Sequence, residues 1–135
     1  MMRIACLLMA GVTALSAAIQ PCVKANMSGR IDQQTEQAVI AYLKLSDNDL
    51  GQPDERDSVH ALGEQLERLI KEQQAGEYDG DEFGGGYAKL YMYGPDANKL
   101  FAAVIDAIKK HSFRRGSYVI KRFGKPGAKE ERIEL

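Results

Sequence analysis

Three consecutive glycines, Gly84–Gly86, separate two segments that have the composition of β-strands, 77–83 and 87–93. Glycine adopts the positive φ angles of tight turns at little cost, so this arrangement predicts a β-hairpin. A hairpin that lies between two helical segments restricts the chain to a small group of folds with an antiparallel sheet. In its second strand, alternation places Ala88, Leu90 and Met92 on the core face and Tyr87, Lys89, Tyr91 and Tyr93 on the opposite face.

Helices are predicted on both sides of the hairpin, because apolar residues recur there at intervals of three and four. The first helix begins at Pro53, which suits a first helical position, and ends near Gln74. The second follows Asp96 and ends at the basic residues Lys109 and Lys110. The two apolar stripes consist of Val59, Leu62, Leu66, Leu69 and Ile70, and of Ala97, Leu100, Phe101, Val104 and Ile108.

Three further strands are predicted over 38–45, 117–123 and 129–135. The order is then β-α-β-β-α-β with a C-terminal edge strand, which is the order of the ferredoxin-like split βαβ sandwich, an α+β fold. Both helices pack on one face of the antiparallel sheet in this fold, so the other face stays open. We expect the open face to be lined by Tyr42, Lys44, Lys89, Tyr91 and Tyr93.

The N-terminus has the three-part pattern of a secretory signal peptide. A basic start at Arg3 precedes the uncharged, mostly apolar run 4–19, and small residues follow at Val23 and Ala25. The run is about 16 residues long, which is shorter than the roughly 20 needed to span a bilayer. We therefore predict cleavage after Ala25 and no membrane span.

These boundaries divide the chain into a signal peptide over 1–25, a linker over 26–36 and a single domain over 37–135. They predict a periplasmic or secreted protein. An alternative is that translation starts at Met27, which would give a cytoplasmic protein. Both cysteines of the chain precede this methionine, so the domain has no thiol under either interpretation.

The chain beyond residue 26 is mildly acidic. When Arg3 and Lys24 are set aside, 16 of the 18 basic residues remain against 19 acidic ones, which is a net charge of −3. A domain with this charge has no overall attraction for nucleic acid or for an anionic membrane. We therefore do not expect nucleic acid as the partner.

The sequence offers no constellation for catalysis, for a metal or for a cofactor. His60 and His111 are the only histidines, and neither has a serine or cysteine arranged beside it or a second ligand at metal-binding spacing. Asp79, Asp81 and Gly84 match too few positions of a calcium loop. The glycine triplet leads into a strand, whereas phosphate-binding loops lead into a helix. We expect no metal, no cofactor and no enzymatic activity.

Three stretches carry a resemblance to known families: GEYDGDEFGGG from Gly76, LYMYGPDA from Leu90 and YVIKRFGKPGA from Tyr118. Together they look like a family of short bacterial ferredoxin-like proteins with no established function, over roughly 37–135. The fragment Tyr78-Asp79-Gly80 is also similar to part of the regulator of ribonuclease E activity B family. That second resemblance implies a ferredoxin-like inhibitor of an RNA-degrading enzyme, and neither resemblance implies catalytic residues.

The function expected from these patterns is that of a non-enzymatic binding or regulatory module. Its partner would be another protein, or a second copy of the chain, because tyrosines on an open sheet face supply contact area at low entropic cost. Two alternatives stay open: a small-ligand sensor or enzyme that uses the same face, and an RNA-binding or ribonuclease-regulating protein. The predicted partner-binding residues are Tyr78, Asp79, Asp81, Glu82, Lys89, Tyr91 and Tyr93.

Overall fold

The structure is a computed structural model that describes residues 36–111 and 113–135. The predicted signal peptide, its cleavage position and all of the predicted linker except Glu36 lie outside the described residues. Within the described part of the chain, no helix is both long and apolar enough to cross a membrane.

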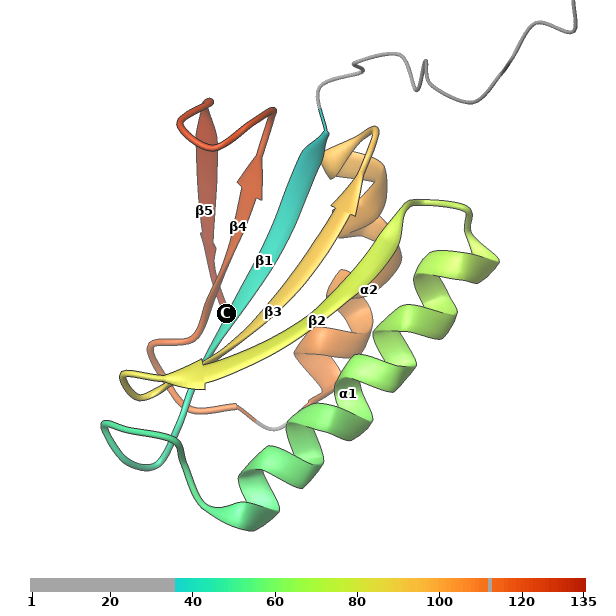
Figure 1. The fold of residues 1–135 in the computed structure, drawn as a ribbon. Coiled ribbons are helices and arrows are strands. Elements are labelled where there is room, and N and C mark those ends of the chain that lie inside the picture. Colours follow the sequence, from blue (N-terminus) through green and yellow to red (C-terminus); the bar gives the residue numbers. More distant parts are fainter. Residues whose placement is uncertain (1–35, 112) are drawn as a thin grey trace, which may run out of the picture. The chain divides into compact units, whose positions relative to one another are not determined.

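Five strands and two helices follow one another in the predicted order (Figure 1). The observed boundaries differ from the predicted ones by one or two residues, as expected for element ends. The elements are β1 Gln37–Lys44, α1 Pro53–Glu72, β2 Glu77–Gly84, β3 Tyr87–Gly94, α2 Ala97–Lys110, β4 Tyr118–Arg122 and β5 Glu130–Glu134.

The strands form one sheet in the order β2-β3-β1-β4-β5, and every neighbouring pair is antiparallel. The first four strands in sequence have the arrangement of the split βαβ sandwich, and β5 extends the sheet beyond β4. Both helices lie on the same side of this sheet (Figure 1). The prediction of an α+β, ferredoxin-like fold is therefore confirmed.

Local sequence explains where the turns and helix ends fall. Gly85 and Gly86 connect β2 to β3 with backbone φ angles of 60° and 78°, which residues other than glycine seldom adopt. The Asp96 side chain caps α2 by accepting hydrogen bonds from the backbone N–H groups of Asn98 and Lys99. The helix α1 ends at Glu72, two residues before the predicted end near Gln74, and Gln74 then takes a positive φ of 49°.

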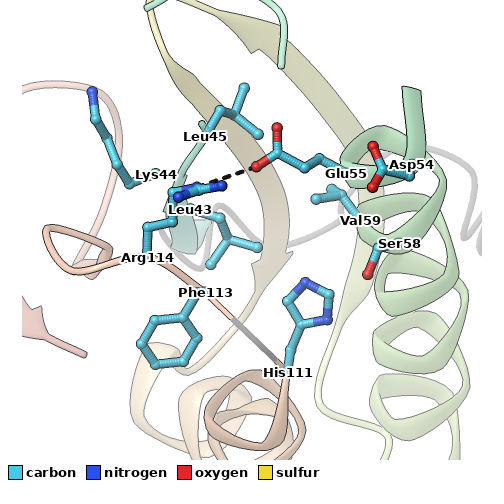
Figure 2. Close-up of a pocket in the computed structure, with 10 residues that line it drawn as sticks. All are labelled: Leu43, Lys44, Leu45, Asp54, Glu55, Ser58, Val59, His111, Phe113 and Arg114. Atoms are coloured by element: carbon cyan, nitrogen blue, oxygen red, sulfur yellow. Dashed lines mark hydrogen bonds and ion pairs between the residues drawn. The ribbon is translucent and has the colours of Figure 1, made fainter. Parts of the chain in front are cut away.

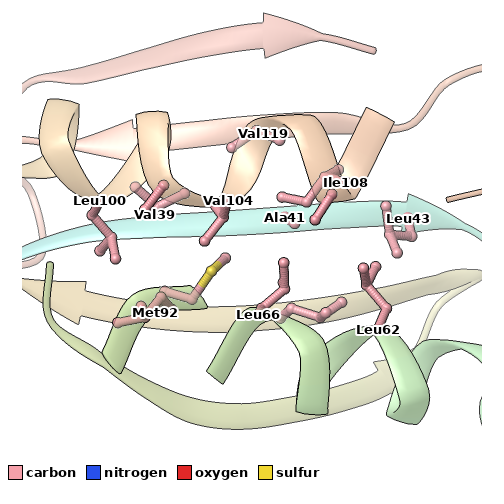
Figure 3. Close-up of a cluster of buried hydrophobic side chains, with 14 of the residues drawn as sticks. Val39, Ala41, Leu43, Leu62, Leu66, Met92, Leu100, Val104, Ile108 and Val119 are labelled. Atoms are coloured by element: carbon pink, nitrogen blue, oxygen red, sulfur yellow. The ribbon is translucent and has the colours of Figure 1, made fainter. Parts of the chain in front are cut away.

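The hydrophobic core fills the space between the sheet and the two helices (Figure 3). Alternate residues of the central strands point into it, and the apolar stripes of α1 and α2 face them. Burying these side chains is the main stabilising contribution to the fold. Figure 3 labels Val39, Ala41, Leu43, Leu62, Leu66, Met92, Leu100, Val104, Ile108 and Val119 among them.

Candidate functional site

The sheet face opposite the helices carries polar and aromatic side chains in regular rows. Cross-strand pairing fixes each row from β2 to β5, because directly paired residues point to the same face. Acidic residues end two of the rows at both outer strands, and tyrosines and isoleucines lie between them. The rows are Glu77, Tyr93, Ala38, Arg122 and Glu130; then Gly80, Tyr91, Ile40, Ile120 and Arg132; then Glu82, Lys89, Tyr42, Tyr118 and Glu134. Together with the paired residues Lys44 and Tyr87, they form what we call the open face.

Three tyrosines from three strands meet on the open face. The Tyr42 and Tyr118 rings are stacked, with centroids 4.6 Å apart and an interplanar angle of 11°. The Tyr87 ring meets both edge-on, at centroid distances of 6.3 and 6.0 Å. Two cations complete the group: the Lys44 ammonium lies 4.7 Å from the Tyr87 centroid, and the Arg132 guanidinium 3.6 Å from that of Tyr118. We call these five side chains the tyrosine cluster.

Three phenols of the open face, those of Tyr42, Tyr91 and Tyr118, have a raised pKa. Partial burial is the largest cause of the raised pKa of Tyr42 and of Tyr118. For Tyr91, burial and a 2.8 Å hydrogen bond from its hydroxyl to the Glu82 carboxylate raise the pKa to about 12. These hydroxyls are therefore neutral hydrogen-bonding groups at pH 7 and not general bases.

Four of the predicted partner-binding residues lie on the open face: Glu82, Lys89, Tyr91 and Tyr93. Glu82 and Lys89 also approach each other as an exposed ion pair at 3.7 Å. The strand pairing thus places the tyrosines and lysines of β1 and β3 on the open face, as predicted.

The other three predicted residues are not part of this surface. Tyr78 and Asp81 pair with core-facing residues of β3, so their side chains point toward the helices. Between them the register shifts, because the β2–β3 pairing is irregular from Tyr78 to Gly80, and this leaves Asp79 exposed at a bulge. The neighbouring predicted residues Asp81 and Glu82 therefore lie on opposite faces of the sheet.

On the helix side, Asp81 lies against His60 of α1. The Asp81 Oδ2 atom is buried and lies 2.8 Å from Nδ1 of His60, while the Asp81 side chain as a whole is 18% exposed. Among the described residues this oxygen has no hydrogen-bond partner, so the close approach to His60 is its contact with α1. The His60 ring also packs edge-on against Phe83 at 5.3 Å. Asp81 therefore ties β2 to α1 and is occupied within the fold.

Tyr78 has a similar structural role. Its hydroxyl lies so close to Gly63 of α1 that a Cβ atom there would be 2.5 Å away. Burial is the largest cause of the raised pKa of this phenol, followed by the charges of Asp81 and Glu67. The side chain is a spacer between β2 and α1, and the small residue at position 63 makes room for it.

Tyr118 and Arg132 lie on the open face but were not among the predicted partner-binding residues. In β4 the apolar residues Val119 and Ile120 are neighbours and point to opposite faces, while Lys121 points into the helix side. Lys121 is 9% exposed and is held there by Asn98 and Glu131. This buried lysine removes the alternation that would have assigned Tyr118 to the open face. Pairing β4 with the predicted edge strand was the only signal that could have brought in Arg132.

A cavity of about 400 Å³ opens where the end of β1 meets the first turns of α1 and the segment that follows α2 (Figure 2). Its apolar wall includes Leu43, Leu45 and Val59, and its polar rim includes Glu55 and Arg114, which form an ion pair at 3.3 Å. The remaining lining residues are Lys44, Asp54, Ser58, His111 and Phe113.

Two titratable groups of this cavity, Glu55 and His111, have a lowered pKa. Glu55 accepts hydrogen bonds from the side chain and backbone of Ser46, from the backbone of Gln52 and from Arg114. The Ser46 bond and then the Gln52 bond are the largest causes that lower the pKa of Glu55 to about 2, so this carboxylate is a poor base. Burial lowers the pKa of His111, which favours the neutral imidazole. Through these hydrogen bonds, Glu55 connects the loop before α1, which holds Ser46 and Gln52, to Arg114 in the segment before β4.

Across residues 36–111 and 113–135, no group of three or more His, Cys, Asp or Glu side chains is arranged to hold a metal ion. No family model matches the chain, and comparisons with curated proteins and with solved structures found no match either. The resemblances noted from the sequence therefore stay predictions.

Proposed function

We propose that this chain is a binding module without catalytic activity and that its open face engages a partner protein. The observation that carries the proposal is the composition of this face: five tyrosines and the half-buried Ile120 on the three inner strands, interspersed with charged groups. Tyrosine is enriched in protein interfaces because it provides a large contact area with few rotatable bonds and a polar tip. The helix side, in contrast, is filled by the protein's own core.

Stacking within the tyrosine cluster argues against single-stranded RNA as the ligand. Proteins that bind RNA on an open sheet stack bases on aromatic rings whose faces are free. Here one face of the Tyr118 ring meets Tyr42 and the other meets Arg132, since β4 lies between β1 and β5. The net charge of −3 beyond residue 26 also opposes attraction to a phosphate backbone.

The charge pattern argues against pairing of two open faces. A two-fold axis along the strands, centred on Ile40, would set Glu77 against Glu130 of the second copy. An axis across the strands would set Glu77 against Glu82 of the second copy. Carboxylates would thus oppose carboxylates at the rim in both aligned arrangements, and such like-charge contacts are costly.

The same pattern defines the partner that fits. It would place basic side chains above the acidic residues of β2 and β5, and apolar or aromatic side chains above Ile120 and the tyrosines of the inner strands. A polar rim around a more apolar centre is the usual anatomy of a protein interface. A regulatory role, including the ribonuclease regulation implied by the weaker resemblance, would be one use of such a contact.

The test is site-specific photocrosslinking in cells, followed by measurement with purified components. A photoreactive residue at Tyr93 should capture one protein, and the same residue at Leu50, which is exposed elsewhere, should not capture it. The purified partner should then bind the Tyr91→Ala/Tyr93→Ala variant at least about tenfold more weakly than wild type, as expected for central aromatic contacts. Leu50→Ala is the matched control and should bind normally.

Three results would overturn the proposal. The first is equal affinity of the double variant and the wild type for the captured protein. The second is a stable dimer of the chain that the double variant abolishes, which would identify a second copy as the occupant. The third is RNA binding that weakens steeply with salt and depends on the same tyrosines.

A further inference from the structure

The strand β5 places an arginine of the chain itself on the open face. The Arg132 guanidinium lies 3.6 Å from the centroid of the Tyr118 ring, and its Nε donates a hydrogen bond to the Glu134 carboxylate. The Arg132 side chain is nevertheless 54% exposed. A guanidinium between an aromatic face and a carboxylate is a common way for proteins to recognise arginine.

We infer that Tyr118 and Glu134 form an arginine-binding position, which Arg132 fills in the free chain and which an arginine of the partner protein takes in the complex. The inference rests on the proposed function and deepens it, because it names the side chain that the partner presents. In this arrangement Arg132 is a built-in competitor, and its displacement is part of the binding reaction.

The Arg132 side chain can leave this position while β5 stays in the sheet. Five backbone pairs join β5 to β4, and Glu131 forms an ion pair at 2.9 Å with the buried Lys121 on the opposite face. These contacts hold the strand and do not involve the guanidinium. Movement of Arg132 therefore requires only a change of rotamer at an exposed site.

Competition follows from the stacking order. The Tyr118 ring has Tyr42 on its other side at 4.6 Å, so a second guanidinium cannot stack on Tyr118 while Arg132 remains. Tyr42 is also flanked by the edge of Tyr87, over which Lys44 lies. The position next to Glu134 is thus the accessible one, and it faces the outer edge of the sheet.

The chemistry favours arginine over lysine at this position. A guanidinium is planar and weakly hydrated, so it stacks on a ring while its N–H groups reach a carboxylate. A lysine ammonium is a more strongly hydrated point charge without the planar fork. We therefore expect the partner segment to carry an arginine that a lysine does not replace.

The experiment uses N-acetyl-arginine amide as the probe, titrated into the full-length protein while the tyrosine ring signals are followed by NMR. Arg132→Ala should bind the probe about two to five times more tightly than wild type, which is the fold-change expected for one exposed cation–π contact. The shifts should be largest at Tyr118. The isosteric neutral probe N-acetyl-citrulline amide should bind neither protein.

Two variants control for charge and for ring chemistry. Lys110→Ala removes one positive charge from the exposed end of α2 and should match wild type. Tyr118→Leu added to Arg132→Ala keeps an apolar side chain and should lose the gain. Equal probe affinity of Arg132→Ala and wild type, or shifts centred away from Tyr118, would overturn the inference.

The outcome is separable from that of the proposed function. If Tyr91→Ala/Tyr93→Ala weakens partner binding but Arg132→Ala changes neither probe nor partner affinity, the interface stands and the arginine position does not. If Arg132→Ala gains probe affinity while the double tyrosine variant binds the partner normally, the arginine position stands and the proposed interface does not.

Discussion

The two faces of this sheet are built from the same strands and nonetheless have different physical characters. On the helix side, Val39, Leu90 and Met92 are completely buried under α1 and α2. On the open face, the side chains from alternate positions are mostly half-buried tyrosines and charged groups. The difference follows from the period of two in a strand and from having only two helices, which cover one side.

Asp81 and Glu82 are adjacent carboxylates that lie on opposite faces of the sheet. Asp81 points toward α1, where its buried Oδ2 atom lies 2.8 Å from Nδ1 of His60. Glu82 points to the open face, where it accepts a hydrogen bond from Tyr91 and remains 59% exposed. One carboxylate is a structural contact and the other is available to a partner. Strand parity, and not residue type, decides between these roles.

The largest expected difference between the faces is in the free energy of unfolding. Leu66→Ala removes a completely buried side chain from the contact of α1 with the sheet and should cost about 2–5 kcal/mol, because a cavity remains. Ile120→Ala, on the half-buried open face, is the matched substitution and should cost about 1 kcal/mol. Urea denaturation measures both. Similar costs would mean that the open face is also covered.

The second prediction compares two pairs of polar side chains that involve β2. His60→Ala removes the ring that lies 2.8 Å from the buried Oδ2 atom of Asp81 and packs against Phe83, and it should cost about 1–3 kcal/mol. Adding Asp81→Asn should recover part of the loss, because it removes a carboxylate whose buried oxygen lacks a hydrogen-bond partner. The exposed pair Lys89–Glu82, at 3.7 Å, should contribute less than about 1 kcal/mol. Double-mutant cycles measure both coupling energies. A larger coupling for Lys89 with Glu82 would reverse the assignment of the two faces.

Much of this division could be predicted from the sequence, because it depends on local periodicity. The alternation of Tyr87–Tyr93 was strong enough to assign every side chain of β3 to its face, and the glycine pair fixed the hairpin. The bulge at Asp79 could not be foreseen, since an extra residue in one strand leaves no compositional signal. It shifts the register at that point, so that Asp81 pairs with the core-facing Leu90 and lies on the helix side.

The tyrosine cluster was beyond prediction for a different reason. Tyr42, Tyr118 and Arg132 come from strands that are adjacent only in space, so their stacking depends on the order of the sheet. Lys121 further obscures the parity of β4, because Asn98 and Glu131 satisfy it in a position that normally holds an apolar residue. The residues that satisfy Lys121 lie on other elements, so the residue pattern of β4 alone does not reveal them.

The third prediction concerns the effect of acid on the hydrogen bonds of Glu55. The hydrogen bonds from Ser46 and Gln52 lower the folded-state pKa of Glu55 to about 2, against an ordinary value of 4.5. The stabilisation from Glu55 is therefore fully present above pH 4.5 and is lost as the pH falls through about 2. Glu55→Gln should lower the melting temperature at pH 7 by a few degrees, and the difference from wild type should vanish in this range. A difference independent of pH would contradict the network.

The smallest predicted effect is on the open face and occurs in alkali. Burial, followed by the hydrogen bond to Glu82, raises the pKa of Tyr91 to about 12 from 10.0, so the folded state holds this proton longer than the unfolded state does. The contribution of Tyr91 to stability is thus present below pH 10 and is lost as the pH rises through 12. Tyr91→Phe identifies its signal in an absorbance titration of the phenolates.

The same titration separates the two causes of the raised pKa of Tyr91, which are burial and the hydrogen bond to Glu82. It also tells whether the surroundings of Tyr91 on the open face are exposed or already desolvated. Glu82→Gln removes the charged acceptor and should lower the pKa of Tyr91, but only in part, because burial is the larger cause. A return to 10.0 would mean that the sheet itself shields Tyr91 very little and that its surroundings are those of an exposed surface. A pKa that stays well above 10.0 would show that neighbouring side chains desolvate the ring before any partner arrives, so less desolvation would be left for binding to complete.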